Sequence, residues 1–253
     1  MFRPRVIPVL LLKGYGLVKT IKFDNERYIG DPINAVKIFN DLEADELVFV
    51  DINATNENRS IDLDLVKKIG DEAYMPFAVG GGIKSTDVIK KLLGAGAEKV
   101  IINSAAFTKP NLVKESSERF GSQSIIVSID IKKSILGNYS IYSNSGNIKQ
   151  KIELQKFLVN MQEAGAGEIM INLINNDGLM EGYDIKLIKE VSDTVTIPVI
   201  ACGGAKDISD LADAYYNGNA SAVAAGSLFV YHGARKAVLI NYPDKSELEK
   251  IFK

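Results

Sequence analysis

The sequence predicts an α/β fold, a (β/α)8 TIM barrel built of two similar half-barrels, and three observations support this prediction. Eight short runs rich in β-branched residues alternate with longer stretches whose apolar residues recur at helical spacing, as in βα units. The chain has 253 residues, and one such barrel needs about 250. One segment of the chain also occurs twice, four βα units apart, as two half-barrels require.

The barrel strands follow from the short apolar runs, each of which ends at a glycine, a small residue or a polar residue. We expect them at Arg5–Leu12, Glu46–Ile52, Pro76–Gly80, Lys99–Asn103, Ser124–Asp130, Glu168–Ile174, Pro198–Ala201 and Ala220–Ala224. Helical spacing follows the first strand in Ile33–Leu42, after Asp31 as N-cap and a proline at the first helical position. Ser85 and Asp207 are the expected N-caps after the third and seventh strands. Because no linker or change of composition divides the chain, residues 1–253 are expected to form a single domain.

The repeat supports closure of the barrel. Pro76–Phe107 and Pro198–Phe229 align without a gap, and each contains a strand, a glycine turn, a helix, a second strand and a turn of small residues. The aligned pairs include Gly81 with Gly203 and Gly82 with Gly204. Two half-barrels of similar sequence explain this register simply.

Composition excludes several classes of function. Thirty basic and thirty-two acidic residues give a net charge of −2, which excludes the basic surface that nucleic acid binding needs. No apolar run is long enough to span a membrane and no signal peptide precedes the first strand, so a cytoplasmic protein is expected. One cysteine and one histidine exclude an internal disulfide and predict no metal site and no cofactor. Acid–base chemistry therefore falls to carboxylates or lysines.

Two pairs of loops at the carboxyl ends of the strands are candidate phosphate sites. Glycines and helix N-termini let backbone N–H groups approach an anion, and loops after strands 7 and 8 often hold phosphate in such barrels. The candidate residues are Gly81, Gly82, Asn103 and Ser104 in the first copy and Gly203, Gly204, Ala225, Gly226 and Ser227 in the second. Tight βα turns are the alternative explanation for any one loop. Two matched pairs favour a ligand with a phosphate at each end.

The chain resembles the cyclase subunit of imidazole glycerol phosphate synthase, a (β/α)8 barrel of histidine biosynthesis, from about Arg5 to about Tyr231. The segments that carry the resemblance are Asp45–Ile52, Pro76–Ile83, Phe120–Gln123, Gly165–Glu168, Asp177-Gly178 and Gly182–Asp184. The resemblance implies a heterodimer with a glutaminase, passage of ammonia through the barrel, and attack on a phosphorylated ribonucleotide at the upper end.

The resemblance also implies two catalytic aspartates, at the ends of strands 1 and 5. Asp130 occupies the strand 5 position, but the strand 1 position holds Leu11. The internal repeat gives the same pairing, because aligning Lys13 with Lys132 puts Leu11 opposite Asp130. Leucine cannot transfer protons, and losing a proton-transfer group typically costs about 10²–10⁴-fold in rate. The two-carboxylate mechanism is therefore expected to fail in this chain.

Other substrate positions of the resemblance are kept. Lys19 lies in the long loop after strand 1, Asp51 ends strand 2 where ribose hydroxyls would bind, and Asp177 and Gly178 close strand 6. Asn175 and Leu179 replace an aspartate and a threonine, which puts ribonucleotide contacts near strand 6 in doubt.

Three further features have structural interpretations at this stage. Cys202 is expected to be a small buried residue, and His232 a surface or capping residue. The alternation in Ser134–Gln150 predicts a small hairpin over the mouth of the barrel, either a lid or surface decoration.

Four charged residues open strands at the lower end of the barrel. Arg5, Glu46, Lys99 and Glu168 match in position and sign the ring that gates the ammonia passage in the resembling subunit. Solvated salt bridges are the alternative for charges at strand starts. Because all four match, we expect a gate.

These observations predict the ammonia-accepting synthase subunit of a glutamine-dependent amidotransferase, an enzyme whose acceptor chemistry has changed. The resemblance extends to paralogues in surface-polysaccharide pathways, which implies an acetamido nucleotide-sugar as the phosphorylated acceptor. One alternative is the cyclase of histidine biosynthesis, with another carboxylate replacing the missing aspartate. A second alternative is a non-catalytic barrel that binds and activates a glutaminase.

Overall fold

Eight parallel strands close into a barrel in the computed structural model, which describes residues 3–253. The strands are β1 (Arg5–Lys13), β4 (Leu47–Asp51), β5 (Phe77–Gly80), β6 (Lys99–Ile102), β7 (Ile125–Lys133), β10 (Glu168–Leu173), β11 (Val199–Cys202) and β12 (Ala222–Ala225). Each pairs in parallel with the next, and β12 pairs with β1. The predicted (β/α)8 barrel is thereby confirmed. Predicted strand ends differ by at most two residues except in β7, which continues to Lys133.

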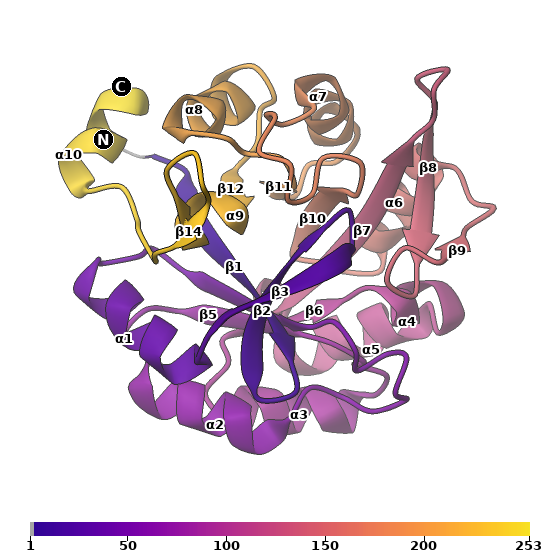
Figure 1. Cartoon of the computed structure of the whole chain (residues 1–253). Helices are drawn as coiled ribbons and strands as arrows, with labels where there is room; N and C mark the ends of the chain where they lie inside the picture. The colour runs from indigo at the N-terminus through magenta and orange to yellow at the C-terminus, as the bar shows by residue number, and fades with distance from the viewer. Residues whose placement is uncertain (1–2) are drawn as a thin grey trace.

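Helices surround the strands on the outside (Figure 1). They are α1 (Pro32–Asp41), α2 (Leu63–Glu72), α3 (Thr86–Gly94), α4 (Ser104–Thr108), α5 (Asn111–Phe120), α6 (Leu154–Glu163), α7 (Ile185–Thr194), α8 (Ile208–Tyr216), α9 (Ser227–Val230) and α10 (Lys245–Ile251), with a 3-10 turn at Ser122–Ser124. The predicted caps are confirmed, because the side chains of Asp31, Ser85 and Asp207 accept N–H groups of the first turns of α1, α3 and α8. These caps fix where each helix begins relative to its preceding strand.

Alternation along each strand divides the core into two apolar clusters. On β1, Val6 and Leu10 face the helices, whereas Ile7 and Val9 belong to a smaller cluster inside the barrel. Successive side chains of a strand point to opposite faces, so Leu11 also faces inward, and it packs partly against the inner cluster. The inward positions of β1 thus run in one line from the amino end of the strand to its carboxyl end.

Two hairpins interrupt the simple βα order, one in each half of the chain. The strands β2 (Gly16–Ile21) and β3 (Asp24–Gly30) follow β1, and β8 (Tyr139–Ser143) and β9 (Ile148–Lys149) follow β7. In Figure 1 the first hairpin crosses over the middle of the barrel. The hairpin predicted within Ser134–Gln150 is confirmed. The expectation of a loop after strand 1 was wrong, because β3 is almost wholly exposed and carries no apolar alternation that could have marked it.

The chain ends in small elements outside the barrel. β13 (Tyr231–His232) pairs antiparallel with β14 (Ala237–Val238), and His232 is exposed there, on the surface as expected. Within residues 3–253, no helix has both the length and the apolar character needed to cross a membrane.

Candidate functional site

A cavity of about 570 Å³ opens at the carboxyl ends of the barrel strands. Every residue that the sequence predicted for the upper end lines it. They are Leu11, Lys19, Asp51, Gly81, Gly82, Asn103, Ser104, Asp130, Asp177, Gly178, Gly203, Gly204, Ala225, Gly226 and Ser227. The fold therefore brings both halves of the predicted site to one cavity.

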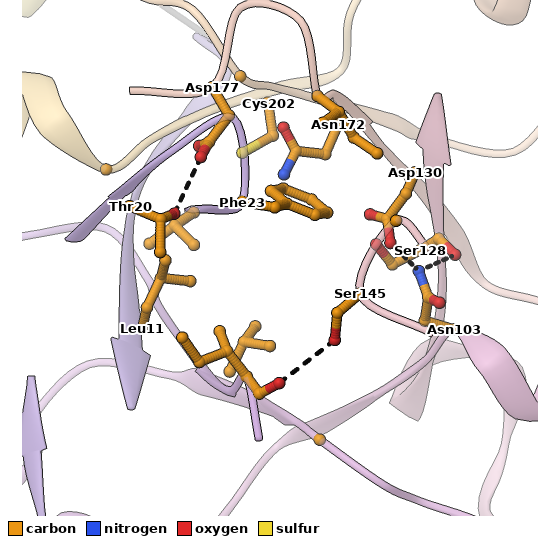
Figure 2. A pocket seen from close by; sticks show the side chains of 18 of the residues that line it. Leu11, Thr20, Phe23, Asn103, Ser128, Asp130, Ser145, Asn172, Asp177 and Cys202 are labelled. Atoms are coloured by element: carbon orange, nitrogen blue, oxygen red, sulfur yellow. Dashed lines mark hydrogen bonds between the residues drawn. The ribbon is translucent and has the colours of Figure 1, made fainter. Parts of the chain in front are cut away.

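Asp130 projects into this cavity from β7, and its side chain is buried (Figure 2). Asn103 Nδ2 donates a hydrogen bond to Asp130 Oδ2 at 3.1 Å. Burial raises the pKa of Asp130 to about 7, and the negative charge of Asp177 adds to this rise. The hydrogen bond from Asn103 acts in the opposite direction and lowers the pKa. Asp130 is not at the end of its strand as predicted, because pairing with β8 extends β7 by three residues. A carboxyl with this pKa exchanges its proton near neutral pH, as acid–base catalysis requires.

Leu11 faces Asp130 across the cavity, at the predicted partner position (Figure 2). Its register neighbours are Val50 on β4 and Val18 on β2. Leu11 and Val50 both pack against the apolar cluster inside the barrel. The β1 side of the cavity is therefore hydrocarbon where the resembling subunit has a carboxylate.

Lys19 and Asp177, both predicted to contact substrate, are paired with each other. Lys19 Nζ donates to Asp177 Oδ1 at 3.0 Å, and Thr20 Oγ1 donates to Asp177 Oδ2 at 3.0 Å (Figure 2). Gly178 permits this approach, since it has a positive φ and a Cβ there would lie 2.2 Å from the Thr20 carbonyl oxygen. Asp177 lies in the turn beyond Leu173, where β10 ends, and not at the strand end as predicted. The pair fastens β2 to that turn.

Asp51 ends β4 as predicted, but an arginine that the sequence did not single out holds it. Arg59 donates to both carboxylate oxygens of Asp51, and the backbone N–H groups of Asn53 and Ala54 each donate to Oδ1 at 3.1 Å. No pattern in one sequence marks an arginine eight residues beyond a strand end. The expected contact of Asp51 with ribose stays a prediction.

The glycines of the first phosphate loop are required by packing alone. Gly81 and Gly82 both have positive φ. A Cβ at Gly81 would lie 2.7 Å from the Asp51 carbonyl oxygen, and a Cβ at Gly82 would lie 1.8 Å from the Arg59 carbonyl oxygen. The tight-turn explanation therefore accounts for these two glycines without a ligand.

Two of the predicted phosphate loops lead into the short helices α4 and α9. Neither helix has a side-chain cap at its N-terminus. Ser227 Oγ is buried and has no hydrogen-bond partner among residues 3–253. Buried polar groups without partners are uncommon in folded proteins, and a helix N-terminus favours an anion. Ser227 therefore supports the prediction of a phosphate site in the second half of the chain.

The two hairpins meet over the mouth. On one side, the Asn144 N–H donates to Ser104 Oγ at 3.0 Å and Ser145 Oγ donates to the Ile52 carbonyl oxygen at 3.3 Å. On the other side, Phe23 at the β2–β3 turn projects into the cavity (Figure 2) and would lie 3.2 Å from a Cβ at Gly146. Residues 145–147 of the β8–β9 turn line the cavity, so this turn lies at the mouth, whereas residues 135–138 at the other end of the predicted segment are exposed. A role as a lid stays a prediction.

One of the two replaced positions near strand 6, Asn175, has a structural explanation. Asn175 Oδ1 accepts the Lys133 N–H at 2.8 Å, and Asn175 Nδ2 donates to the Lys133 carbonyl oxygen at 3.1 Å. An ionised aspartate at this position could only accept. Cys202 is buried as expected, and burial raises the pKa of its thiol to about 12. Nothing in the structure explains Leu179.

A closed ring of alternating charges lies at the other end of the barrel. Arg5 donates hydrogen bonds to the carboxylates of Glu46 and Glu168, and the distance from Arg5 Nη2 to Glu168 Oε1 is 2.9 Å. Lys99 Nζ lies 3.2 Å from Glu46 Oε1 and 3.0 Å from Glu168 Oε1. Glu46 and Lys99 are buried, which distinguishes this ring from solvated surface salt bridges. Above it lies the apolar cluster inside the barrel, with Ala78 and Ile126 among its members.

Asp130→Asn is expected to stabilise the folded protein progressively between about pH 4 and pH 7. The carboxyl ionises near its ordinary pKa of 3.8 in the unfolded chain but near 7 in the folded protein. Between these values the folded state binds the extra proton, so wild-type stability falls by about 1 kcal/mol per pH unit, and asparagine does not titrate. Urea unfolding of both proteins from pH 4 to pH 8 measures this difference. Asp87→Asn, at an exposed side chain, is the control, and a pH-independent difference for Asp130→Asn would contradict the prediction.

The chain is similar in sequence to known proteins over almost its whole length. Residues 5–235 match the family model described as histidine biosynthesis protein. A Pseudomonas aeruginosa protein, provisionally named imidazole glycerol phosphate synthase subunit hisF2, is 46% identical over 98% of this chain and 99% of its own length. A Vibrio vulnificus protein, provisionally named imidazole glycerol phosphate synthase subunit hisF3, is 44% identical over 99% of this chain and 96% of its own length. Imidazole glycerol phosphate synthase subunit HisF of Natranaerobius thermophilus is 41% identical over 98% of this chain and 99% of its own length.

Proposed function

The chain belongs to the histidine biosynthesis protein family, among its imidazole glycerol phosphate synthase subunits of the HisF type, and we propose that it is a divergent member with a changed acceptor. It acts as the ammonia-accepting synthase subunit of a glutamine-dependent amidotransferase. A glutaminase docks as the second subunit of a heterodimer at the end that carries the charged ring. Ammonia enters there and reaches a phosphorylated acceptor in the cavity at the opposite end.

One observation carries this proposal, the combination of an intact ring below with Leu11 facing Asp130 above. The ring supports delivery of ammonia, and the apolar inner cluster suits passage of a neutral molecule. Leu11 removes one of the two proton-transfer groups that ring closure in the histidine pathway uses. An acceptor that reacts with a single acid–base group, Asp130, is compatible with this site.

The proposed acceptor is the acetamido group of a nucleotide-linked sugar, of the kind used in surface polysaccharides. Ammonia adds to the amide carbon and the carbonyl oxygen leaves as water, which converts the acetamido group into an acetamidino group. In this proposal Asp130 protonates the departing oxygen, which its pKa of about 7 supports. The buried Ser227 hydroxyl, which has no hydrogen-bond partner among residues 3–253, supports binding of the diphosphate.

The cyclase reaction of histidine biosynthesis is the second candidate. The name of the Natranaerobius thermophilus relative favours it, because that protein is similar over nearly its whole length. In this case another cavity carboxylate would replace the missing aspartate. Asp51 and Asp177 line the cavity, but both are held in ion pairs.

Ammonium salt in place of the glutaminase separates these candidates, because it bypasses delivery and tests only the chemistry of the cavity. The wild type is incubated with ammonium and either the bisphosphorylated ribonucleotide of the histidine pathway or an acetamido nucleotide-sugar. We expect no turnover of the ribonucleotide and formation of an amidine on the sugar. Ribonucleotide turnover would favour the histidine pathway, and binding without turnover of either would indicate a non-catalytic barrel.

A further inference from the structure

Asn103 lies between β6 and α4, where the sequence predicted a phosphate ligand. It is the N-cap residue of α4, and asparagine is one of the residues that most often cap a helix with their side chain. The side chain of Asn103 makes no such capping bond. Its amide is directed towards β7 instead (Figure 2). The contacts with β7 therefore take the place of a helix cap that this residue could have made.

Both donors of the Asn103 amide are used within the protein. Nδ2 donates to the Ser128 carbonyl oxygen at 3.2 Å and to Asp130 Oδ2 at 3.1 Å. Oδ1 accepts a hydrogen bond from Ser104 Oγ at 3.3 Å. A primary amide has two N–H donors, so none is left for an ionised phosphate oxygen. Asn103 differs in this respect from Ser227, whose buried hydroxyl has no partner among residues 3–253.

These contacts also fix which end of the amide faces Asp130. Exchange of the amide oxygen and nitrogen would place Oδ1 against the Ser128 carbonyl oxygen, which can only accept. The nitrogen must therefore face β7, and it presents a donor to Asp130 in a single orientation.

The carboxyl of Asp130 depends on this one neighbour. Among residues 3–253, the hydrogen bond from Asn103 is the only one that reaches the Asp130 side chain, and it reaches Oδ2. Asn172, the register partner of Asp130 on β10, also lines the cavity but makes no hydrogen bond with it. Oδ1 of Asp130 is therefore left for a molecule in the cavity.

We propose that Asn103 is a positioning residue, which holds Oδ2 of Asp130 so that Oδ1 meets the reacting group of the acceptor, and that its side chain does not bind phosphate. The inference rests on the acid–base role of Asp130 in the proposed function but not on the identity of the acceptor. A donor at Oδ2 stabilises the ionised carboxylate, which enables Asp130 to accept a proton as well as to give one. Without that donor, the buried carboxyl is held in its protonated form.

Carbon-13 NMR titration of the aspartate carboxyls measures this effect without a substrate. The Asp130 signal is identified by its absence from Asp130→Asn, and in the wild type it is expected to titrate near pH 7. Asn103→Leu keeps the approximate shape of the side chain and removes the donor, so the pKa of Asp130 is expected to rise by about one unit. Asn172→Leu makes the same exchange on the other side of Asp130 but breaks no hydrogen bond to it. Its expected rise is less than about half as large.

The other ionisable groups near Asp130 are the same in both leucine variants. They come from the strands and loops that pack around β7, namely Lys19, Lys132, Tyr142, Asp177 and Cys202. A difference between the two variants therefore reports the hydrogen bond and not a change of neighbouring charge.

Calorimetric titration of the full chain with inorganic pyrophosphate separates positioning from phosphate binding. Asn103→Leu is expected to bind pyrophosphate within about twofold of the wild-type affinity. Ser227→Ala removes the unpaired hydroxyl and is expected to bind it about tenfold more weakly. A tenfold loss in Asn103→Leu would show that the side chain binds phosphate, and would overturn the inference.

An unchanged pKa of Asp130 in Asn103→Leu, or an equal rise in Asn172→Leu, would also overturn the inference and leave the proposed function intact. If Asn103→Leu does not fold, Asn103→Ala replaces it, because alanine adds no atoms to the loop, and the same outcomes decide. A wild-type Asp130 that titrates near its ordinary pKa of 3.8 would overturn the proposed acid–base role together with the inference.

Discussion

The Leu11→Asp variant is expected to turn over the bisphosphorylated ribonucleotide of the histidine pathway at least about 100-fold faster than the wild type. Leu11 faces Asp130 across the cavity, so an aspartate at position 11 places a second carboxyl at the position that the two-carboxylate mechanism requires. A positioned proton-transfer group contributes about 10²–10⁴-fold in rate. Product formation with excess ammonium salt and no glutaminase measures the gain without involving the partner.

Leu11→Asn is the matched control for this experiment, because asparagine has nearly the shape of aspartate but does not exchange a proton. It is expected to remain as inactive as the wild type. Equal gains in both variants would mean that polarity at position 11 matters and proton transfer does not. High activity of the unmodified chain would mean that Leu11 does not mark a change of reaction.

Lys99→Met is expected to lower the free energy of unfolding by about 3–5 kcal/mol, because it leaves buried carboxylates without a full set of partners. Lys99 pairs with both Glu46 and Glu168, and the side chain of Glu46 is only 2% exposed. Methionine has a similar length and shape, so the change removes the charge with little loss of packing. Urea unfolding at pH 7 measures the difference.

A surface ion pair provides the control for Lys99→Met. Lys114 lies 4.0 Å from Glu118 on α5, and both side chains are about two-thirds exposed. Lys114→Met is expected to cost less than about 0.5 kcal/mol, as exposed pairs at this spacing do. Similar losses in the two variants would show that burial does not strengthen the ring. The double variant Lys99→Met with Glu46→Gln is expected to recover part of the loss, because it removes one of the two carboxylates that Lys99 no longer neutralises and leaves Arg5 to pair with Glu168.

The barrel could be predicted from sequence because its signal is local and repeated. Runs such as Val6–Leu12 are apolar on both faces, as strands buried between helices and a barrel interior must be. Glycine turns and helix caps then marked where each strand ended. The hairpin β2–β3 gave no such signal, since only its first strand is buried and its second is polar and exposed.

The site could be predicted as a set of residues but not as a set of contacts. Position at the carboxyl ends of strands was enough to bring Leu11, Asp130 and Ser227 to one cavity. The partners of Asp51 and Asp177 were missed, because Arg59 reaches Asp51 from a loop and Thr20 reaches Asp177 from the hairpin strand β2, and the path of both segments depends on packing. Such pairings join segments whose relative placement no short sequence pattern encodes.

The single inward line on β1 has a consequence for how such enzymes change over evolutionary time. Arg5 contributes to the closed ring at one end of that line and Leu11 to the cavity at the other, with only apolar side chains between them on this face. Under the proposed function, a point mutation at the far end exchanges one reaction for another while the ring that is proposed to admit ammonia stays unchanged. A duplicated gene would already encode the charged ring, so only residues that line the cavity would need to change for a new acceptor.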